Sequence, residues 1–254
     1  MKKSCSQLKD AARECLLGHY GILIGAMIII TLAVILCNIP FNNIMRQGIQ
    51  FMVPARILLG YVGSMVVSLV AMIFSSGLAY MHLNIARKKP IQFGDVLYCL
   101  KNRPDKYLGF GLIMLIVSTV SMLPGMLCSI IGAFLALDRA NLSTAFMLLY
   151  LSIIFYVVGC IVVIIIALMW SQTIFLLLDH PELTVRETMK KSKHLMKGNK
   201  GRLFVLYISF IGWFFLGLLT FGLGFLWIEH YLLQSQTQFY LDLIPAPEAT
   251  QEIL

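Results

Sequence analysis

Charged residues are scarce in this sequence: only 13% of its 254 residues are Asp, Glu, Lys or Arg, whereas 59% are hydrophobic. A soluble globular domain carries about a quarter charged residues, so the composition excludes an ordinary soluble domain. Charge is missing altogether from five stretches, 15–45, 57–86, 107–137, 140–178 and 203–228. Each is longer than the roughly 20 residues that cross a hydrocarbon core as a helix. The sequence therefore predicts an all-α protein, a polytopic bundle of transmembrane helices.

A sixth span is weaker than the first five. The segment Phe221-Gly222-Leu223-Gly224 can reverse the chain, so that a polar-faced helix returns inside the bundle, although hydropathy alone gives five spans. We predict one integral membrane domain over residues 1–254 with six spans, at about 18–39, 57–82, 107–136, 145–172, 203–221 and 224–243.

Basic residues are rare outside three segments, which indicates an orientation. Of the 20 Lys and Arg residues, 17 lie in the N-terminal tail, in the loop 87–106 and in the loop 179–202. By the positive-inside rule these segments face the cytoplasm. Because no Lys or Arg follows Arg202, a cytoplasmic C-terminus is expected only from the sixth span.

The loop 179–202 carries helix signals of its own. Thr184-Val185-Arg186-Glu187 fits a capping box, and Gly198 supplies a left-handed stop. We predict an amphipathic cytoplasmic helix between spans four and five, with Val185, Met189, Ser192 and Met196 on one face. The surrounding basic residues are candidate contacts to anionic lipid: Arg186, Lys190, Lys191, Lys193 and Lys197. The alternative is that these lysines are solvated and only fix the topology.

An intramembrane polar site is expected if the sixth helix exists. Acids inside a membrane are costly and usually face a cavity or a partner. Glu229 is then the candidate buried acid, and Ser209, Gln234 and Gln236 are its candidate partners. If the chain instead leaves the membrane here, Glu229 and His230 lie in the far interface.

Signatures of catalysis are missing. The six cysteines form no C-x-x-C pair, the five histidines form no H-x-x-x-H pair, and no nucleotide-binding or hydrolase motif occurs. We predict no catalytic residue, no metal, no cofactor and no enzymatic activity. Nucleic acid is not an expected partner, because the positive charge lies in blocks between apolar runs.

The last third of the chain resembles a bacterial family of integral membrane proteins called domain of unknown function 975. The resemblance rests on Leu8 to Arg13, Leu17 to Gly21, Phe93 to Leu97 and, above all, residues 171–243, where the motif residues are Asp179, Pro181, Gly198, Gly212, Trp213, Gly222 and Gly224. It implies a compact six-span bundle in the bacterial cytoplasmic membrane and no established activity. The family's Pro-Gly before the segment at 170–172 is replaced by Val162-Val163, whereas Pro124-Gly125 lies in the preceding span.

The segment 179–200 is also similar to the membrane domains fused to some glycerophosphodiester phosphodiesterases, which implies proximity to lipid. Two functions stay open. The first is a non-enzymatic membrane protein that binds lipid or an unknown membrane-protein partner through its basic loops. The second is a small-solute transporter with a path lined by Glu229, Gln234, Gln236, Gln238 and the Pro124-Gly125 break.

Overall fold

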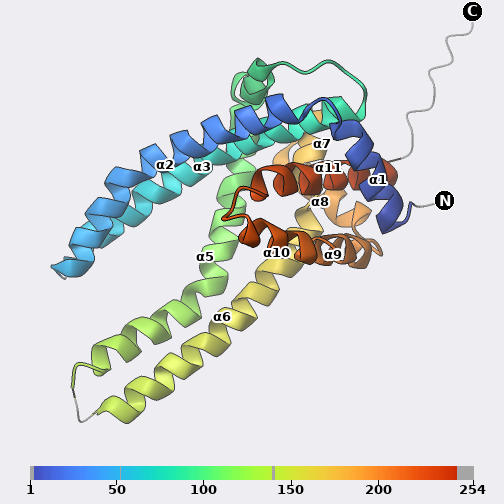
Figure 1. Ribbon diagram of the computed structural model, residues 1–254. Helices are drawn as coiled ribbons and strands as arrows, with labels where there is room; N and C mark the ends of the chain where they lie inside the picture. The colour runs from blue at the N-terminus through green and yellow to red at the C-terminus, as the bar shows by residue number, and fades with distance from the viewer. Residues whose placement is uncertain (1–2, 52, 139–140, 245–254) are drawn as a thin grey trace, which may run out of the picture.

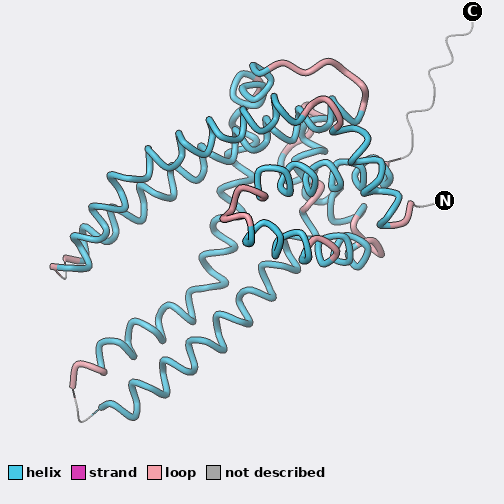
Figure 2. Tube along the Cα trace, in the orientation of Figure 1, coloured by secondary structure: helices cyan, strands magenta, loops and turns pink. Residues whose placement is uncertain are grey.

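The computed structural model describes residues 3–51, 53–138 and 141–244. In these ranges every regular element is a helix (Figure 2). In chain order they are α1 (Cys5–Leu16), α2 (Tyr20–Gln50), α3 (Pro54–Ala86), the 3-10 helix η1 (Phe93–Leu97), α4 (Tyr98–Lys101), α5 (Pro104–Leu135), α6 (Leu142–Trp170), α7 (Thr173–Asp179), α8 (Val185–Leu195), α9 (Lys200–Ile208), α10 (Ile211–Leu219) and α11 (Phe225–Leu243).

Five helical segments are long and apolar enough to cross a membrane: Tyr20–Gln50, Ala55–Ala86, Pro104–Leu135, Leu142–Asp179 and Lys200–Leu219. They coincide with the five strong spans that the sequence predicts, and the protein is accordingly a multi-pass helical membrane protein. The first extends well beyond its predicted end at residue 39, because α2 continues through Pro40. Proline is tolerated inside membrane helices when neighbouring groups satisfy the freed backbone.

The long helices pair as hairpins, α2 with α3 and α5 with α6 (Figure 1). Small residues let these backbones approach closely. A Cβ atom added to Gly159 of α6 would lie 2.6 Å from the carbonyl oxygen of Ser121 in α5. The two hairpins diverge from a common end, and α5 bends along its length (Figure 1). A third, shorter hairpin consists of α9 and α10 paired with α11.

The packed core lies at the end of the molecule where the basic loops gather. Three clusters of buried apolar residues join α3, α5, α7, α8 and α11, then α1, α9 and α11, and finally α1, α2, α3 and η1. The rest of the long hairpins presents large exposed apolar side chains, such as Leu36, Leu58 and Phe134. A contiguous apolar surface of this kind is typical of a face that meets lipid.

Helix α1 closes this core from the N-terminal side. Leu8, Ala12 and Leu16 point inward and are almost completely buried. Lys9 Nζ donates a 3.0 Å hydrogen bond to the carbonyl oxygen of Ser209, where α9 ends and α10 has not yet begun. The ammonium group thus satisfies a carbonyl that the helix break leaves free.

Candidate functional site at the basic end

Helix α8 begins with the capping box that the sequence predicts. The backbone N–H and the hydroxyl of Thr184 donate to Glu187 Oε2 over 2.8 and 2.7 Å, and the Glu187 N–H returns a 3.4 Å hydrogen bond to Thr184 Oγ1. The backbone hydrogen bond from Thr184, followed by the one from its hydroxyl, lowers the pKa of Glu187. After α8, Gly198 adopts φ +80°, the left-handed stop expected there.

The apolar face of α8 packs onto the protein. Met189, Ser192 and Met196 are buried, and the Ser192 hydroxyl donates to the carbonyl oxygen of Met169 in α6 over 3.0 Å. This face is therefore not available to lie in a lipid interface. The five basic residues singled out from the sequence are all exposed: Arg186, Lys190, Lys191, Lys193 and Lys197. The result is a basic surface on a fixed helix.

Asp179 joins three helices at this end. The two terminal nitrogens of Arg87, just after α3, donate to the two carboxylate oxygens of Asp179 over 2.8 and 2.7 Å. The hydroxyl of Tyr240 in α11 donates to Asp179 Oδ2 over 2.8 Å. The motif residue Pro181 follows at the exposed surface, and the buried Lys106 Nζ donates to its carbonyl oxygen and to that of Leu183. The Asp-x-Pro motif thus ties the ends of α3, α5, α7 and α11 together.

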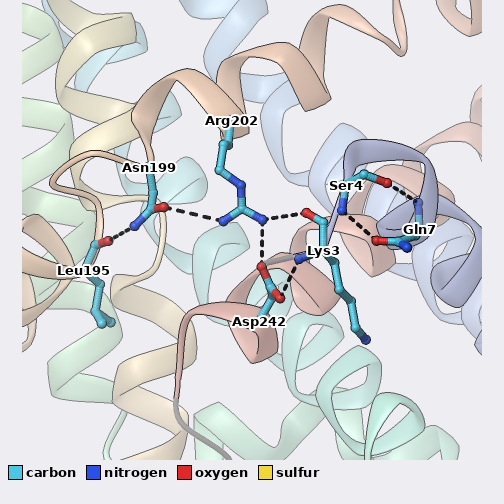
Figure 3. A network of polar contacts seen from close by, with 7 residues as sticks. All are labelled: Lys3, Ser4, Gln7, Leu195, Asn199, Arg202 and Asp242. Atoms are coloured by element: carbon cyan, nitrogen blue, oxygen red, sulfur yellow. Dashed lines mark hydrogen bonds and ion pairs between the residues drawn. The ribbon is translucent and has the colours of Figure 1, made fainter. Parts of the chain in front are cut away.

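A second polar network ties the N-terminus to the end of α11 (Figure 3). Arg202 Nη2 donates to Asp242 Oδ2 and to the carbonyl oxygen of Lys3, each over 2.7 Å, while its other terminal nitrogen approaches Asn199 Oδ1 at 3.4 Å. The Lys3 backbone N–H donates to Asp242 Oδ1 over 3.1 Å. Charge-assisted hydrogen bonds of this kind are the stronger ones in proteins, so α9, α11 and the N-terminus are held in one arrangement.

The remaining motif residues lie on the third hairpin. Gly212 and Trp213 are exposed on α10. Gly222 has φ +89°, and the N–H of Gly224 donates to Thr220 Oγ1 over 2.8 Å. The predicted reversal at residues 221–224 is confirmed, and residues 225–243 do return as a helix.

Glu229 is not the buried acid that was expected. Its side chain is exposed on α11 and lines a surface pocket of about 270 Å³ together with Gln236 and Ser171. The predicted partners bind elsewhere: Gln236 Nε2 donates to the Ser171 carbonyl, the Ser209 hydroxyl donates to the Leu206 carbonyl, and Gln234 is fully buried. The reason is helical phase, because Glu229 lies one residue away from the stripe that faces the core.

That stripe brings the predicted Gln234 together with His230 and with His82 of α3, which the sequence analysis did not single out. His82 of α3 and His230 and Gln234 of α11 are almost completely buried. His82 Nδ1 lies 2.6 Å from Gln234 Oε1, and His82 Nε2 lies 3.1 Å from His230 Nδ1. Two signals pointed here: a histidine inside a charge-free span, and the spacing of four between His230, Gln234 and Gln238. Gln238 is also buried and donates to Cys15 Sγ.

The Pro124-Gly125 break, which the transporter interpretation places on the solute path, does not lie at this stripe. A Cβ atom added to Gly125 would lie 2.8 Å from the ring of Tyr156 in α6, so the Pro124-Gly125 segment packs within the second hairpin. Among the residues that the structure describes, no three His, Cys, Asp or Glu side chains gather as a metal site requires.

Comparison with models of protein families identifies the family of this chain. The model of the family described as "Protein of unknown function (DUF975)" matches residues 1–246. The chain belongs to this family. Neither the comparison with curated proteins nor that with solved structures found a match. The matched residues include the network around Asp179, the network around Arg202 and the whole third hairpin. The family description assigns no activity.

Proposed function

We propose that this DUF975 protein is a non-enzymatic membrane protein that binds anionic lipids through the basic surface of α8. The observation that carries the proposal is the division of α8 into two faces. Met189, Ser192 and Met196 are buried in the protein, whereas the five basic side chains between residues 186 and 197 are exposed.

The charge on α8 is sufficient for this role. A basic residue close to an anionic leaflet contributes about 1 kcal/mol, so five of them together reach about 5 kcal/mol where all are in contact. Since α8 is capped and packed, little conformational entropy is lost when lipid headgroups meet it. The resemblance to the membrane domains of glycerophosphodiester phosphodiesterases also favours a role close to lipid.

The proposed orientation puts this surface in the cytoplasm of a bacterial cell, beneath the cytoplasmic membrane. It follows from the 17 basic residues in the N-terminal tail and the loops 87–106 and 179–202. Both termini lie on this side in the six-span arrangement, and they also do so if the third hairpin turns back before crossing.

Retention of lipid by the purified protein tests the proposal. We expect Lys190→Gln with Lys193→Gln to weaken the binding of phosphatidylglycerol, measured by native mass spectrometry during titration into detergent, by about tenfold or more, because two contacts of about 1 kcal/mol are lost. The matched control is Arg46→Gln with Arg56→Gln, which removes two exposed charges near the turn between α2 and α3.

Two outcomes contradict the proposal. An equal loss in both double variants means that lipid follows total charge rather than α8. Unchanged binding in the α8 variant means that its lysines serve another purpose, such as an acidic partner protein or topology alone.

One observation favours a second candidate, the small-solute transporter. The side-chain nitrogen of Gln234 is buried and has no hydrogen-bond partner among the residues that the structure describes. A buried, unpaired donor is costly and is a natural point of contact for a polar solute. Identification of a small polar molecule that co-purifies with the wild type, but not with Gln234→Leu, supports transport over lipid binding.

A further inference from the structure

The turn of the third hairpin carries large apolar side chains that are exposed on the protein surface. Phe221 is 100% exposed, Leu219 76% and Leu223 65%. In the preceding helix α10, Gly217 is the buried residue, and Ile211, Trp213, Phe214, Phe215, Leu216 and Leu218 are all exposed. Residues 211–228 contain no charged residue, and Thr220 is their one side chain with a hydroxyl. The next charged residue, Glu229, lines the pocket that α11 forms with α3 and α7.

The two long hairpins end differently. Asn42, Asn43 and Arg46 lie in the last turns of α2, and Asp138 follows α5 where Asn141 donates to its carboxylate over 2.9 Å. Polar and charged residues of this kind suit a turn in water. The sequence Leu219-Thr220-Phe221-Gly222-Leu223 does not.

The third hairpin also falls short of the others. Tyr231 of α11 packs against the cluster that contains Leu23 and Ala26 of α2. From there the nine residues from 230 back to Gly222 reach about 14 Å, whereas the 24 residues of α2 beyond Ala26 extend about 36 Å. The turn therefore ends about 20 Å before α2 does, at 1.5 Å per residue. Figure 1 shows the α10–α11 turn well short of the ends of both long hairpins.

The backbone N–H groups of the turn are all satisfied inside the hairpin. Every N–H from Thr220 to Phe225 has an acceptor within 3.2 Å inside the hairpin. The N–H of Gly222 donates to the Gly217 carbonyl over 3.0 Å, and the Thr220 hydroxyl both accepts from Gly224 and donates to Gly217. A non-helical turn in hydrocarbon needs this, because lipid offers no hydrogen bonds.

From these observations we infer that α9, α10 and α11 form a re-entrant hairpin. It enters the membrane from the basic side, turns at residues 220–224 inside the hydrocarbon core, and returns to the same side. The exposed side chains of α10 and the turn pack against lipid acyl chains. The chain then crosses the membrane fully four times, and this arrangement holds whether or not α8 binds anionic lipid.

Accessibility of the turn to a membrane-impermeant thiol reagent tests the inference. Phe221→Cys and Leu223→Cys are each compared with Gln50→Cys, an exposed position at the end of α2, with labelling of the native cysteines as the baseline. We expect Gln50→Cys to be labelled in intact cells. The two turn variants stay at baseline in intact cells and in inverted vesicles, and they react once detergent replaces the bilayer.

Labelling of either turn variant in intact cells overturns the inference, because the hairpin then crosses the membrane. Labelling from the basic side in inverted vesicles overturns it equally, because the turn is then outside the hydrocarbon. The alternative to lipid is that a second copy of the chain covers the exposed turn. Oxidative cross-linking of Phe221→Cys between two chains in the membrane would show this contact and contradict packing against lipid.

A spectroscopic measurement needs no cysteine. With Trp170 and Trp227 replaced by Phe, the exposed Trp213 on α10 is the one remaining tryptophan of the three. Lipids brominated along their acyl chains should quench its fluorescence in reconstituted vesicles, and aqueous iodide should not. The reverse pattern places α10 in water and refutes the inference.

Discussion

Replacing Tyr240 by Phe isolates one hydrogen bond between α11 and the end of α7. The side chain is fully buried, and its hydroxyl donates to Asp179 Oδ2 over 2.8 Å. The phenylalanine ring keeps the stacked contact with Phe175, whose centroid lies 5.1 Å away. Arg87 also keeps its two hydrogen bonds to the carboxylate. The substitution therefore removes the hydroxyl contact and leaves the packing in place.

A hydrogen bond to a charged group contributes about 1.5–3 kcal/mol. Because Arg87 still neutralises Asp179 in the variant, we expect a loss of about 2 kcal/mol in the free energy of unfolding. For a chain of this size, about 2–4 °C per kcal/mol gives a melting midpoint about 4–8 °C lower. The midpoint is measured on the detergent-purified protein as the temperature at which half of the monodisperse fraction is lost.

Tyr150→Phe is the matched control, because Tyr150 is 70% exposed on α6. Equal midpoints for the two Tyr→Phe variants refute the assignment of a stabilising role to the Tyr240 hydroxyl. Asp179→Asn provides a further check. It leaves the Arg87 guanidinium facing a neutral amide, so its midpoint must fall at least as far as that of Tyr240→Phe.

Three further perturbations test separate parts of the fold. Gly77→Ala should lower the melting midpoint by the equivalent of about 1–3 kcal/mol, because its Cβ atom would lie 2.0 Å from the Val96 carbonyl oxygen. The control Gly94→Ala places its Cβ atom in open space and should leave the midpoint unchanged. Equal effects of the two substitutions contradict this expectation. Glu187 has a lowered pKa, so its share of α8 stability is present above the ordinary value of 4.5 and is lost as the pH falls through the lower folded value. Amide exchange in α8, corrected for intrinsic rates, should therefore rise as the pH falls below the ordinary value of 4.5 in the wild type but not in Glu187→Gln, and identical profiles exclude this role. His82→Ala leaves two buried partners in α11 unpaired and should cost about 1–3 kcal/mol for each in a thermal melt; an unchanged midpoint shows that water replaces the ring.

Local patterns in the sequence were sufficient to predict the local structure. The absence of charge located five helices, and the Thr184–Glu187 spacing located the start of α8. Gly198 located a left-handed stop, and residues 221–224 located a chain reversal. Each of these features depends on residues within a few positions of one another. The face of α8 that turns inward also follows from spacing, because Met189, Ser192 and Met196 recur every three or four residues.

The polar interior of the protein was predicted only in part: Gln234 on a returning polar-faced helix was expected, whereas its contact with His82 was not, because that contact joins distant segments. His82 and His230 are 148 residues apart and meet only when α11 packs against α3. The same packing decides that Gln234 faces inward while Glu229 faces out. Hydropathy treats all of these residues alike as interruptions of an apolar run, so it cannot say which of them the bundle encloses.

Helix length also misleads when it is read alone. The 20 residues from Lys200 to Leu219 are long enough to cross a membrane, yet the helix breaks at Ser209 and Phe210, where Lys9 supplies a donor to the free carbonyl. The partner helix α11 has 19 residues, and its polar side chains must face the protein to find hydrogen-bond partners. The break in the first arm and the polar stripe of the second are the features that favour the inferred hairpin, held at the basic end, over two separate spans. The Arg202–Asp242 ion pair, at 2.7 Å, joins the two arms at that end.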